Sequence, residues 1–256
     1  MGKRFRRYAV SSFKGESVHM NIALLLSGGI GERLDSKIPK QYLKICGRPI
    51  ILYCLESLYA HKGIHGIQIV AAPIWQKKIR GWMKTIDTKG KFKGFSIPGS
   101  TRQLSILHGL EDIYKYAGES DIVLIHDAVR PILTEGQVTA CLDASLEHEG
   151  AVPVLPMKDT VYRSRDRRMI TELLNRDEIY AGQAPEAFHL GKYLKANRKL
   201  LPKRILQING STEPAVIAGM DIAMIPGNEN NFKITTRADL EHFQRIEEQR
   251  LKNGAG

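Results

Sequence analysis

Short apolar runs alternate along this chain with longer segments of helical periodicity. Residues 22–26, 66–72, 121–125 and 151–155 are mostly apolar, and each run has the length of a buried strand. Between these runs, apolar residues recur three and four positions apart, as they do on one face of a helix. The alternation predicts an α/β fold, a Rossmann-like, mainly parallel sheet flanked by helices.

The expected helices follow these strands. Pro49 stands where the first helix begins, because proline is tolerated in the first turn of a helix. Helices are expected over residues 51–58, 74–83, 104–117, 190–200 and 237–251. One further strand is expected at residues 221–225.

Residues 158–170 depart from this alternation. The β-prone residues 160–162 and the apolar residues 169–170 flank a polar turn at 163–168. This pattern is typical of a β-hairpin rather than of a crossover helix. Exposed hairpins often contact a partner subunit, so we expect residues 156–185 to form a protruding arm used for dimerisation.

The chain has 256 residues, of which 43% are hydrophobic, so it is long enough to bury a sizeable core. Residues 20–256 show no repeat and no linker, and we expect them to form one domain.

The net charge of +11 suggests a nucleic-acid partner, but residues 1–19 carry +4 of it in a basic N-terminal tail without apolar periodicity. We expect this tail to be dispensable. The remaining charge is interspersed with acidic residues, and a basic balance also suits a pocket for phosphates.

Composition excludes several other classes of protein. No stretch approaches the roughly 18 to 20 uncharged apolar residues of a membrane-spanning helix, so no membrane partner is expected. Cys46, Cys54 and Cys141 show no Cys-x-x-Cys spacing, which argues against a disulfide framework and a zinc site. These features fit a protein of the reducing cytoplasm.

Glycines follow the first strand in the sequence Ser27-Gly28-Gly29-Ile30-Gly31. Backbone N–H groups in such a loop can approach phosphate oxygens without obstruction by side chains. The loop is neither a P-loop, which needs Gly-Lys-Ser/Thr, nor a dinucleotide fingerprint, which needs a third glycine where Leu34 stands. A plain glycine-rich turn is the alternative interpretation.

Arg33 and Lys40 follow the glycines closely. Two fixed cations beside a glycine loop form a clamp for a triphosphate, and they matter most where negative charge grows in the transition state. The sequence therefore predicts a nucleotide-triphosphate site, with these two residues as catalytic candidates.

At these residues the chain resembles a known family. Leu-Ser-Gly-Gly-Ile-Gly-Glu-Arg at 26–33 and Pro-Lys-Gln-Tyr-Leu at 39–43 are similar to the opening of the CTP-dependent polyol-phosphate cytidylyltransferases. That family includes the methylerythritol 4-phosphate enzyme of isoprenoid synthesis and the ribitol 5-phosphate enzyme of teichoic-acid and capsule synthesis. The resemblance continues in order through residues 99–105, 126–131, 158–160, 175–176 and 231–236.

The resemblance implies a nucleotidyltransferase fold of the glycosyltransferase-A-like type. It also implies a homodimer that transfers CMP from CTP to a polyol phosphate with Mg²⁺ and releases pyrophosphate. It assigns Lys233, with Arg33 and Lys40, to charge at the reacting phosphate. The cytosine and ribose would be contacted by Gly99, Arg102 and Ser105. The polyol phosphate would be bound, partly across the dimer interface, by Arg130, Thr160 and Arg176.

Asp127 follows the strand at 121–125, at the end where open parallel sheets bind ligands. A carboxylate there can bind a polyol hydroxyl or Mg²⁺. His126 is expected to be structural. Without the resemblance, Lys233 would be an ordinary surface lysine and Arg176 a salt-bridge partner.

The chain departs from the family pattern at three places. Ser100 and Thr101 replace the usual acidic residue, Ala184-Pro185-Glu186 replaces Thr-Pro-Gln, and residues 209–213 replace Thr-Asp-(Asp/Glu). The last two concern the acceptor pocket, so the acceptor stays open, although residues 180–185 look closer to the ribitol branch. An enzyme using UTP or a sugar phosphate is the alternative. A nucleic-acid binder is disfavoured because aromatic residues do not interleave with the basic clusters.

Overall fold

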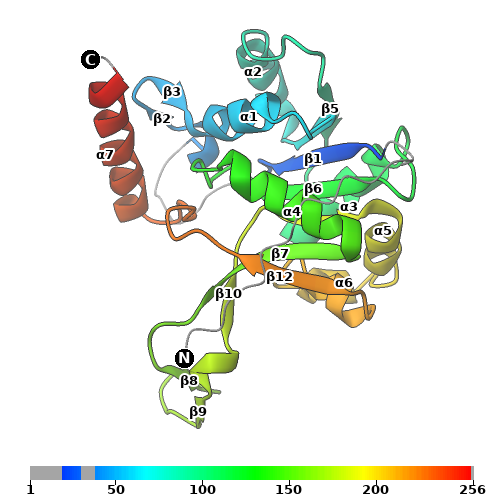
Figure 1. Cartoon of the computed structure of the whole chain (residues 1–256), viewed down its shortest axis with the longest axis vertical. Helices are drawn as coiled ribbons and strands as arrows, with labels where there is room; N and C mark the ends of the chain where they lie inside the picture. Colours follow the sequence, from blue (N-terminus) through cyan, green and yellow to red (C-terminus); the bar gives the residue numbers. More distant parts are fainter. Residues whose placement is uncertain (1–18, 30–37, 255–256) are drawn as a thin grey trace.

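The computed structural model of the chain describes residues 19–29 and 38–254. A central eight-stranded sheet has the order β10-β7-β11-β6-β1-β4-β5, and β12 also pairs with β7 (Figure 1). The strands are β1 (Asn21–Leu26), β4 (Gly66–Val70), β5 (Phe92–Ser96), β6 (Ile122–Asp127), β7 (Gly150–Pro156), β10 (Tyr180–Gly182), β11 (Glu186–His189) and β12 (Ile222–Pro226). The pairs β1·β4, β1·β6, β4·β5 and β7·β12 are parallel, which confirms the mainly parallel sheet, while β10 and β11 run antiparallel to their neighbours.

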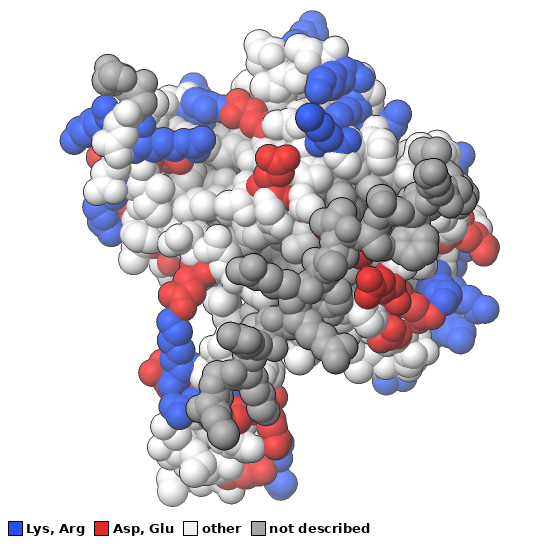
Figure 2. All heavy atoms as spheres, viewed as in Figure 1, with Lys and Arg blue, Asp and Glu red and all other residues white. Residues whose placement is uncertain are grey.

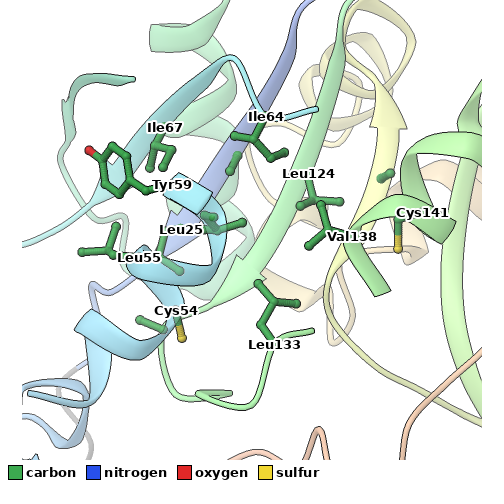
Figure 3. Close-up of a cluster of buried hydrophobic side chains, with 14 of the residues drawn as sticks. Leu25, Cys54, Leu55, Tyr59, Ile64, Ile67, Leu124, Leu133, Val138 and Cys141 are labelled. Atoms are coloured by element: carbon green, nitrogen blue, oxygen red, sulfur yellow. The ribbon is translucent and has the colours of Figure 1, made fainter. Parts of the chain in front are cut away.

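Helices cover both faces of this sheet. They are α1 (Ile50–Ala60), α2 (Pro73–Met83), α3 (Arg102–Ile113), α4 (Glu135–Glu147), α5 (Leu190–Arg198), α6 (Glu213–Ile217) and α7 (Arg237–Gly254). Alternate residues of β1 belong to two cores: Ala23 and Leu25 pack with residues of α1 and α4, and Ile22 and Leu24 pack with residues of α3 and α5. Figure 3 shows Leu25 of the first core near Leu55 and Cys54. The continuous apolar run at residues 22–26 of β1 is therefore what a strand covered on both faces requires.

The pattern of apolar residues did not predict three elements of the body, β5, β11 and α4. The strand β5 is interrupted by Gly94, whose φ is +152°, and β11 pairs antiparallel with both β6 and β7. The helix α4 begins at a capping box, in which Thr134 Oγ1 accepts from Gln137 N at 3.3 Å and Gln137 Oε1 accepts from Thr134 N at 3.1 Å. This cap satisfies backbone groups that the start of a helix would leave unpaired.

The arm projects from the body and ends in a small hairpin of β8 (Val161–Arg163) and β9 (Glu172–Leu174) (Figure 1). The hairpin was predicted, but the prediction of its second strand at residues 169–170 was wrong. Asp166 Oδ1 accepts hydrogen bonds from the N–H groups of Arg168 and Met169, both at 2.9 Å. These bonds extend the turn, so the returning strand begins later.

Smaller elements complete the described chain. They are the hairpin β2 (Lys44–Ile45) and β3 (Arg48–Pro49) and the 3₁₀ segments η2 (Lys40–Tyr42), η3 (Arg176–Glu178) and η4 (Arg204–Gln207). On the face drawn in Figure 2, basic side chains gather over α2 and along the arm, with acidic side chains among them. Within residues 19–29 and 38–254, no helix is both long and apolar enough to cross a membrane.

Candidate active site

The glycine loop is fastened by the two residues that follow Lys40. Gln41 Nε2 donates to the carbonyl oxygens of Ser27 at 2.8 Å and of Gly29 at 2.7 Å. The Tyr42 hydroxyl lies 2.6 Å from Ser27 Oγ and 2.9 Å from Ser27 O. Gln41 and Tyr42 are both buried. Because Lys40 begins the same 3₁₀ turn, these contacts tie its backbone to the loop.

Two glycines of the motifs permit a close approach of backbone segments. A Cβ on Gly28 would lie 2.7 Å from the side chain of Pro98, and a Cβ on Gly99 would lie 2.3 Å from Leu104 Cβ. Among the described residues, nothing lies within 4 Å of a Cβ built on Gly29. Packing therefore requires glycine at 28 and 99, whereas no described residue packs against Gly29, which suits a position where a ligand approaches the backbone.

The turn into α3 is closed by Ser105. Its Oγ accepts from Gly99 N at 3.0 Å and donates to Thr101 O at 2.9 Å. Thr101 caps the helix, with its Oγ1 accepting from Leu104 N at 3.2 Å. These bonds place Arg102 in the first turn of α3, beside the carboxyl end of β6.

Asp127 binds three cations at that end of β6. Arg102 Nη2 lies 3.0 Å from Asp127 Oδ1, Lys233 Nζ lies 2.9 Å from Oδ2, and Arg130 Nε lies 3.8 Å from Oδ2. Asp127 is 6% exposed. Burial alone would raise the pKa of Asp127, but the charges of Arg102, Lys233 and Arg130 outweigh it and hold this pKa well below its usual range. We call these four residues the Asp127 cluster.

The sheet register brings the Asp127 cluster next to the glycine loop. Leu26 of β1 is paired with Asp127 of β6, and Ala128 N donates to Leu26 O at 3.0 Å. Ser27 therefore begins the loop directly beside the buried carboxylate. A phosphate-binding loop and a group of cations meet at the carboxyl ends of two central strands, where open parallel sheets bind ligands.

His126 supports the cluster from inside. It is fully buried, and its Nε2 lies 3.0 Å from Arg130 O. Burial lowers the pKa of His126 to about 4, so the ring is neutral at physiological pH. It is suited to orienting the Arg130 backbone rather than to transferring protons.

Comparison with known sequences identifies the family. The sequence profile of the IspD family, 2-C-methyl-D-erythritol 4-phosphate cytidylyltransferase, matches residues 21–249. The chain belongs to this family. It is therefore an enzyme of the cytidylyltransferase class, as the sequence motifs predicted.

Relatives of this cytidylyltransferase include enzymes with two different names. It is 31% identical over 229 residues to a ribitol-5-phosphate cytidylyltransferase of Vibrio parahaemolyticus, covering 89% of this chain and 95% of the relative. It is 34% identical over 226 residues to a bifunctional enzyme IspD/IspF of Maricaulis maris, covering 87% of this chain but 56% of that longer protein.

The fold of the cytidylyltransferase also matches solved structures. The 4-diphosphocytidyl-2C-methyl-D-erythritol synthase of Anaerococcus prevotii superposes with a TM-score of 0.76 at 23% identity, covering 90% of this chain and 96% of the other. The superposition supports the architecture alone.

The cytidylyltransferase has another buried acid near the Asp127 cluster, to which the sequence analysis assigned no role. Glu186 on β11 lies opposite Ile125 of β6 and is 8% exposed. Burial raises its pKa, although the charge of Arg102 and a hydrogen bond with Ser211 act against this rise. Among the described residues, Glu186 Oε2 has no hydrogen-bond partner. In the sequence, the departure from the family pattern at residues 184–186 was the feature that could have drawn attention to Glu186.

The donor set of this cytidylyltransferase does not fit a resident metal ion at Asp127. Both carboxylate oxygens of Asp127 face cations, which repel a further positive charge. In the part of the chain that the structure describes, no three His, Cys, Asp or Glu residues gather as metal ligands.

Four predicted residues are not part of the geometry described so far. Gly31 and Arg33 are outside the described residues. Thr160 and Arg176 are exposed on the arm, which Figure 1 shows projecting from the body, and Arg176 Nη1 donates to Lys158 O at 2.8 Å. One chain therefore brings the cluster and the loop together, but it does not bring Thr160 and Arg176 to them.

Proposed function

We propose that this enzyme transfers CMP from CTP to the phosphate of a polyol phosphate and releases pyrophosphate. The observation that carries the proposal is the Asp127 cluster, which lies directly beside the glycine loop. Two polyanions must be held together in this reaction, and a preorganised group of cations lowers the cost of doing so. The names of the relatives suggest ribitol 5-phosphate or 2-C-methyl-D-erythritol 4-phosphate as the acceptor.

An oxygen of the acceptor phosphate would attack the α-phosphorus of CTP. A new bond forms between that oxygen and the α-phosphorus, while the bond from the α-phosphorus to the bridging oxygen of the β-phosphate breaks and pyrophosphate leaves. The second pKa of a phosphate monoester is about 6, so the nucleophile is already mostly a dianion at neutral pH. The protein needs no general base, which agrees with the neutral and buried state of His126.

The catalytic work is then the neutralisation of charge. Arg33, Lys40 and Lys233 would bind the oxygens of the reacting phosphates, and Mg²⁺ bound to CTP would neutralise the triphosphate further. The backbone of the glycine loop would bind the same phosphates through its N–H groups. Gly99 and Ser105 shape the turn into α3, where cytosine and ribose would lie.

Asp127 would act as the electrostatic centre of the acceptor site. Its carboxylate gives Arg102, Arg130 and Lys233 fixed directions before the substrates bind. An incoming phosphate can share these cations, and a polyol hydroxyl can donate to the carboxylate. Arg130 and Lys233 would then bind the acceptor phosphate.

A second copy of the chain would complete the acceptor site. The arm exposes the apolar side chains of Tyr162, Met169, Ile170 and Leu173, each more than half exposed. Such side chains suit a partner subunit. We propose a homodimer in which Thr160 and Arg176 of one arm reach the acceptor site of the other chain.

The compartment that we propose is the cytoplasm. The buried thiols Cys54 and Cys141 suit a cytoplasmic enzyme.

Pyrophosphate release tests the proposal. The full chain is incubated with Mg²⁺ and CTP, UTP, ATP or GTP, together with ribitol 5-phosphate, methylerythritol 4-phosphate or a sugar phosphate. We expect release that requires both CTP and a polyol phosphate, with ribitol 5-phosphate the better acceptor. Release that prefers another triphosphate would overturn the proposal.

A further inference from the structure

The buried amide of Gln183 joins the base of the arm to the start of the segment that carries Lys233. Gln183 directly follows β10, the strand by which the arm returns to the body. Its Oε1 accepts from Asn228 N at 2.9 Å, and its Nε2 donates to Asn228 O at 3.0 Å. The side chain thus pairs with both backbone groups of one residue, as a neighbouring strand would. Gln183 is 6% exposed, so water does not compete freely for these bonds.

The residue before Asn228 shows how closely the two segments fit. Gly227 N donates to Val154 O at 2.9 Å, which attaches it to the end of β7. A Cβ on Gly227 would lie 2.7 Å from Gln183 Oε1 and 3.0 Å from Val154 O. Only glycine leaves room for the Gln183 amide here. We call residues 227–234 the strap.

The strap continues from this attachment to the Asp127 cluster. Asn231 is fully buried, its Nδ2 donates to Ala184 O at 2.6 Å, and its carbonyl oxygen accepts from Arg130 Nη1 at 2.6 Å. Ile234 N then donates to Val129 O at 2.9 Å. Lys233 lies between these last two attachments, and from there its ammonium group reaches Asp127.

We propose that Gln183 is a positioning residue for Lys233: by fixing the start of the strap it sets where the lysine ammonium lies relative to the reacting phosphates. The inference rests on the catalytic role proposed for Lys233. A lysine has a long and flexible stem, so the backbone at its root determines which oxygens it can reach. Gln183 itself touches no reacting atom.

Gln183→Met tests the inference, because it keeps the length of the side chain and removes both hydrogen bonds. We expect kcat for CTP-dependent pyrophosphate release to fall roughly ten- to a hundred-fold, as small misplacements of catalytic groups do, with KM for CTP changed much less. Gln68→Met is the matched control. Gln68 is equally buried and bonds Ser96 and Tyr116 through its amide, but it lies on β4, towards the opposite edge of the sheet. This control should keep kcat within about two-fold.

A second readout does not depend on activity. Trace acetylation with acetic anhydride, read by mass spectrometry of peptides, measures how accessible the Lys233 amine is. Loosening the strap should weaken the contact of Lys233 with Asp127 and raise its labelling several-fold in Gln183→Met, but not in Gln68→Met. Gly227→Ala, which leaves Gln183 unchanged but crowds its amide, should reproduce both effects. It replaces Gln183→Met if that variant does not fold.

The outcomes separate the two proposals. Unchanged labelling of Lys233 with unchanged kcat would overturn the positioning role, as would an equal loss of kcat in Gln68→Met. If the wild-type chain released no pyrophosphate from CTP, the proposed function would fail, and labelling would still decide whether Gln183 positions Lys233.

Discussion

The ammonium group of Lys233 lies 2.9 Å from Asp127 Oδ2, although the two residues come from distant parts of the chain. The strap brings the lysine to this contact, and β6 brings the carboxylate. Arg102 forms an ion pair with the other oxygen of the same carboxylate, Asp127 Oδ1. One buried anion therefore organises cations from three separate segments, and variants that alter it should affect catalysis more than binding.

Asp127→Asn should lower kcat roughly 10²-fold, by analogy with the loss of one oriented group in other active sites. The cations lose the charge that directs them, but the cluster becomes more positive by one unit. KM for CTP and for the acceptor should therefore not rise. Steady-state kinetics with both substrates check this split. Asp221→Asn, at an exposed carboxylate paired with His148, is the control and should keep wild-type kcat. A wild-type kcat in Asp127→Asn would refute the organising role.

Lys40→Ala should lower kcat by roughly 10² to 10³, about 3 to 4 kcal/mol, with a much smaller effect on CTP affinity. A lysine beside the glycine loop gains most where charge grows at the α-phosphorus. Lys40→Gln keeps length and polarity but loses the charge, so its kcat should fall nearly as far. Lys44→Ala, at an exposed lysine in the neighbouring β2, provides the control. If kcat stayed unchanged and only KM for CTP rose, Lys40 would contribute uniform binding instead.

Light scattering should give twice the 28.7 kDa mass of one chain if the arm mediates dimerisation. Arg176→Ala and Lys40→Ala chains should each be nearly inactive, and mixing them should restore part of the activity. In a mixed dimer, one site receives the intact Lys40 from one chain and the intact Arg176 from the other. Full activity from a monomer would contradict this arrangement.

The buried ring of His126 makes stability depend on pH. The unfolded chain binds a proton at His126 below about 6.5, whereas the folded chain does so only near 4. The buried neutral ring therefore contributes its full share to the free energy of unfolding above pH 6.5, and this share is lost as the pH falls towards 4. The total loss is about 3 kcal/mol. Urea unfolding at about pH 7 and about pH 5 should show a smaller loss for His126→Gln than for the wild type. Equal losses would show that His126 does not titrate in this way.

The strands and helices that could be predicted were those with strong periodicity. β1, β6 and α3 follow directly from their apolar spacing. The antiparallel strand β11 could not be predicted, because its four residues carry no alternation that distinguishes it from a loop. Its place in the sheet depends on pairing with β6 and β7, which is a property of the assembled fold.

The candidate active site shows the same division. The position of Asp127 at the end of β6 could be predicted because the residue follows a recognisable strand, and the position of Lys40 beside the loop because it lies close to the glycines in sequence. The structural roles of Gln183 and Asn231 could not be predicted, although both lie in segments that resemble the family, because buried amides that bond backbone groups show no characteristic spacing. Their roles become apparent only where segments distant in the sequence lie side by side.

The outer part of the arm, residues 158–178, is a segment whose two ends lie close together. Met157 N donates to Ile179 O at 3.1 Å, and Pro156 is paired with Tyr180. A short turn could join β7 and β10 at this point without altering their pairing. The arm is thus structurally separable from the body. If it mediates the proposed dimer, exchanging it for another arm would change how subunits recognise each other, while the sheet and the cations on it would keep their architecture.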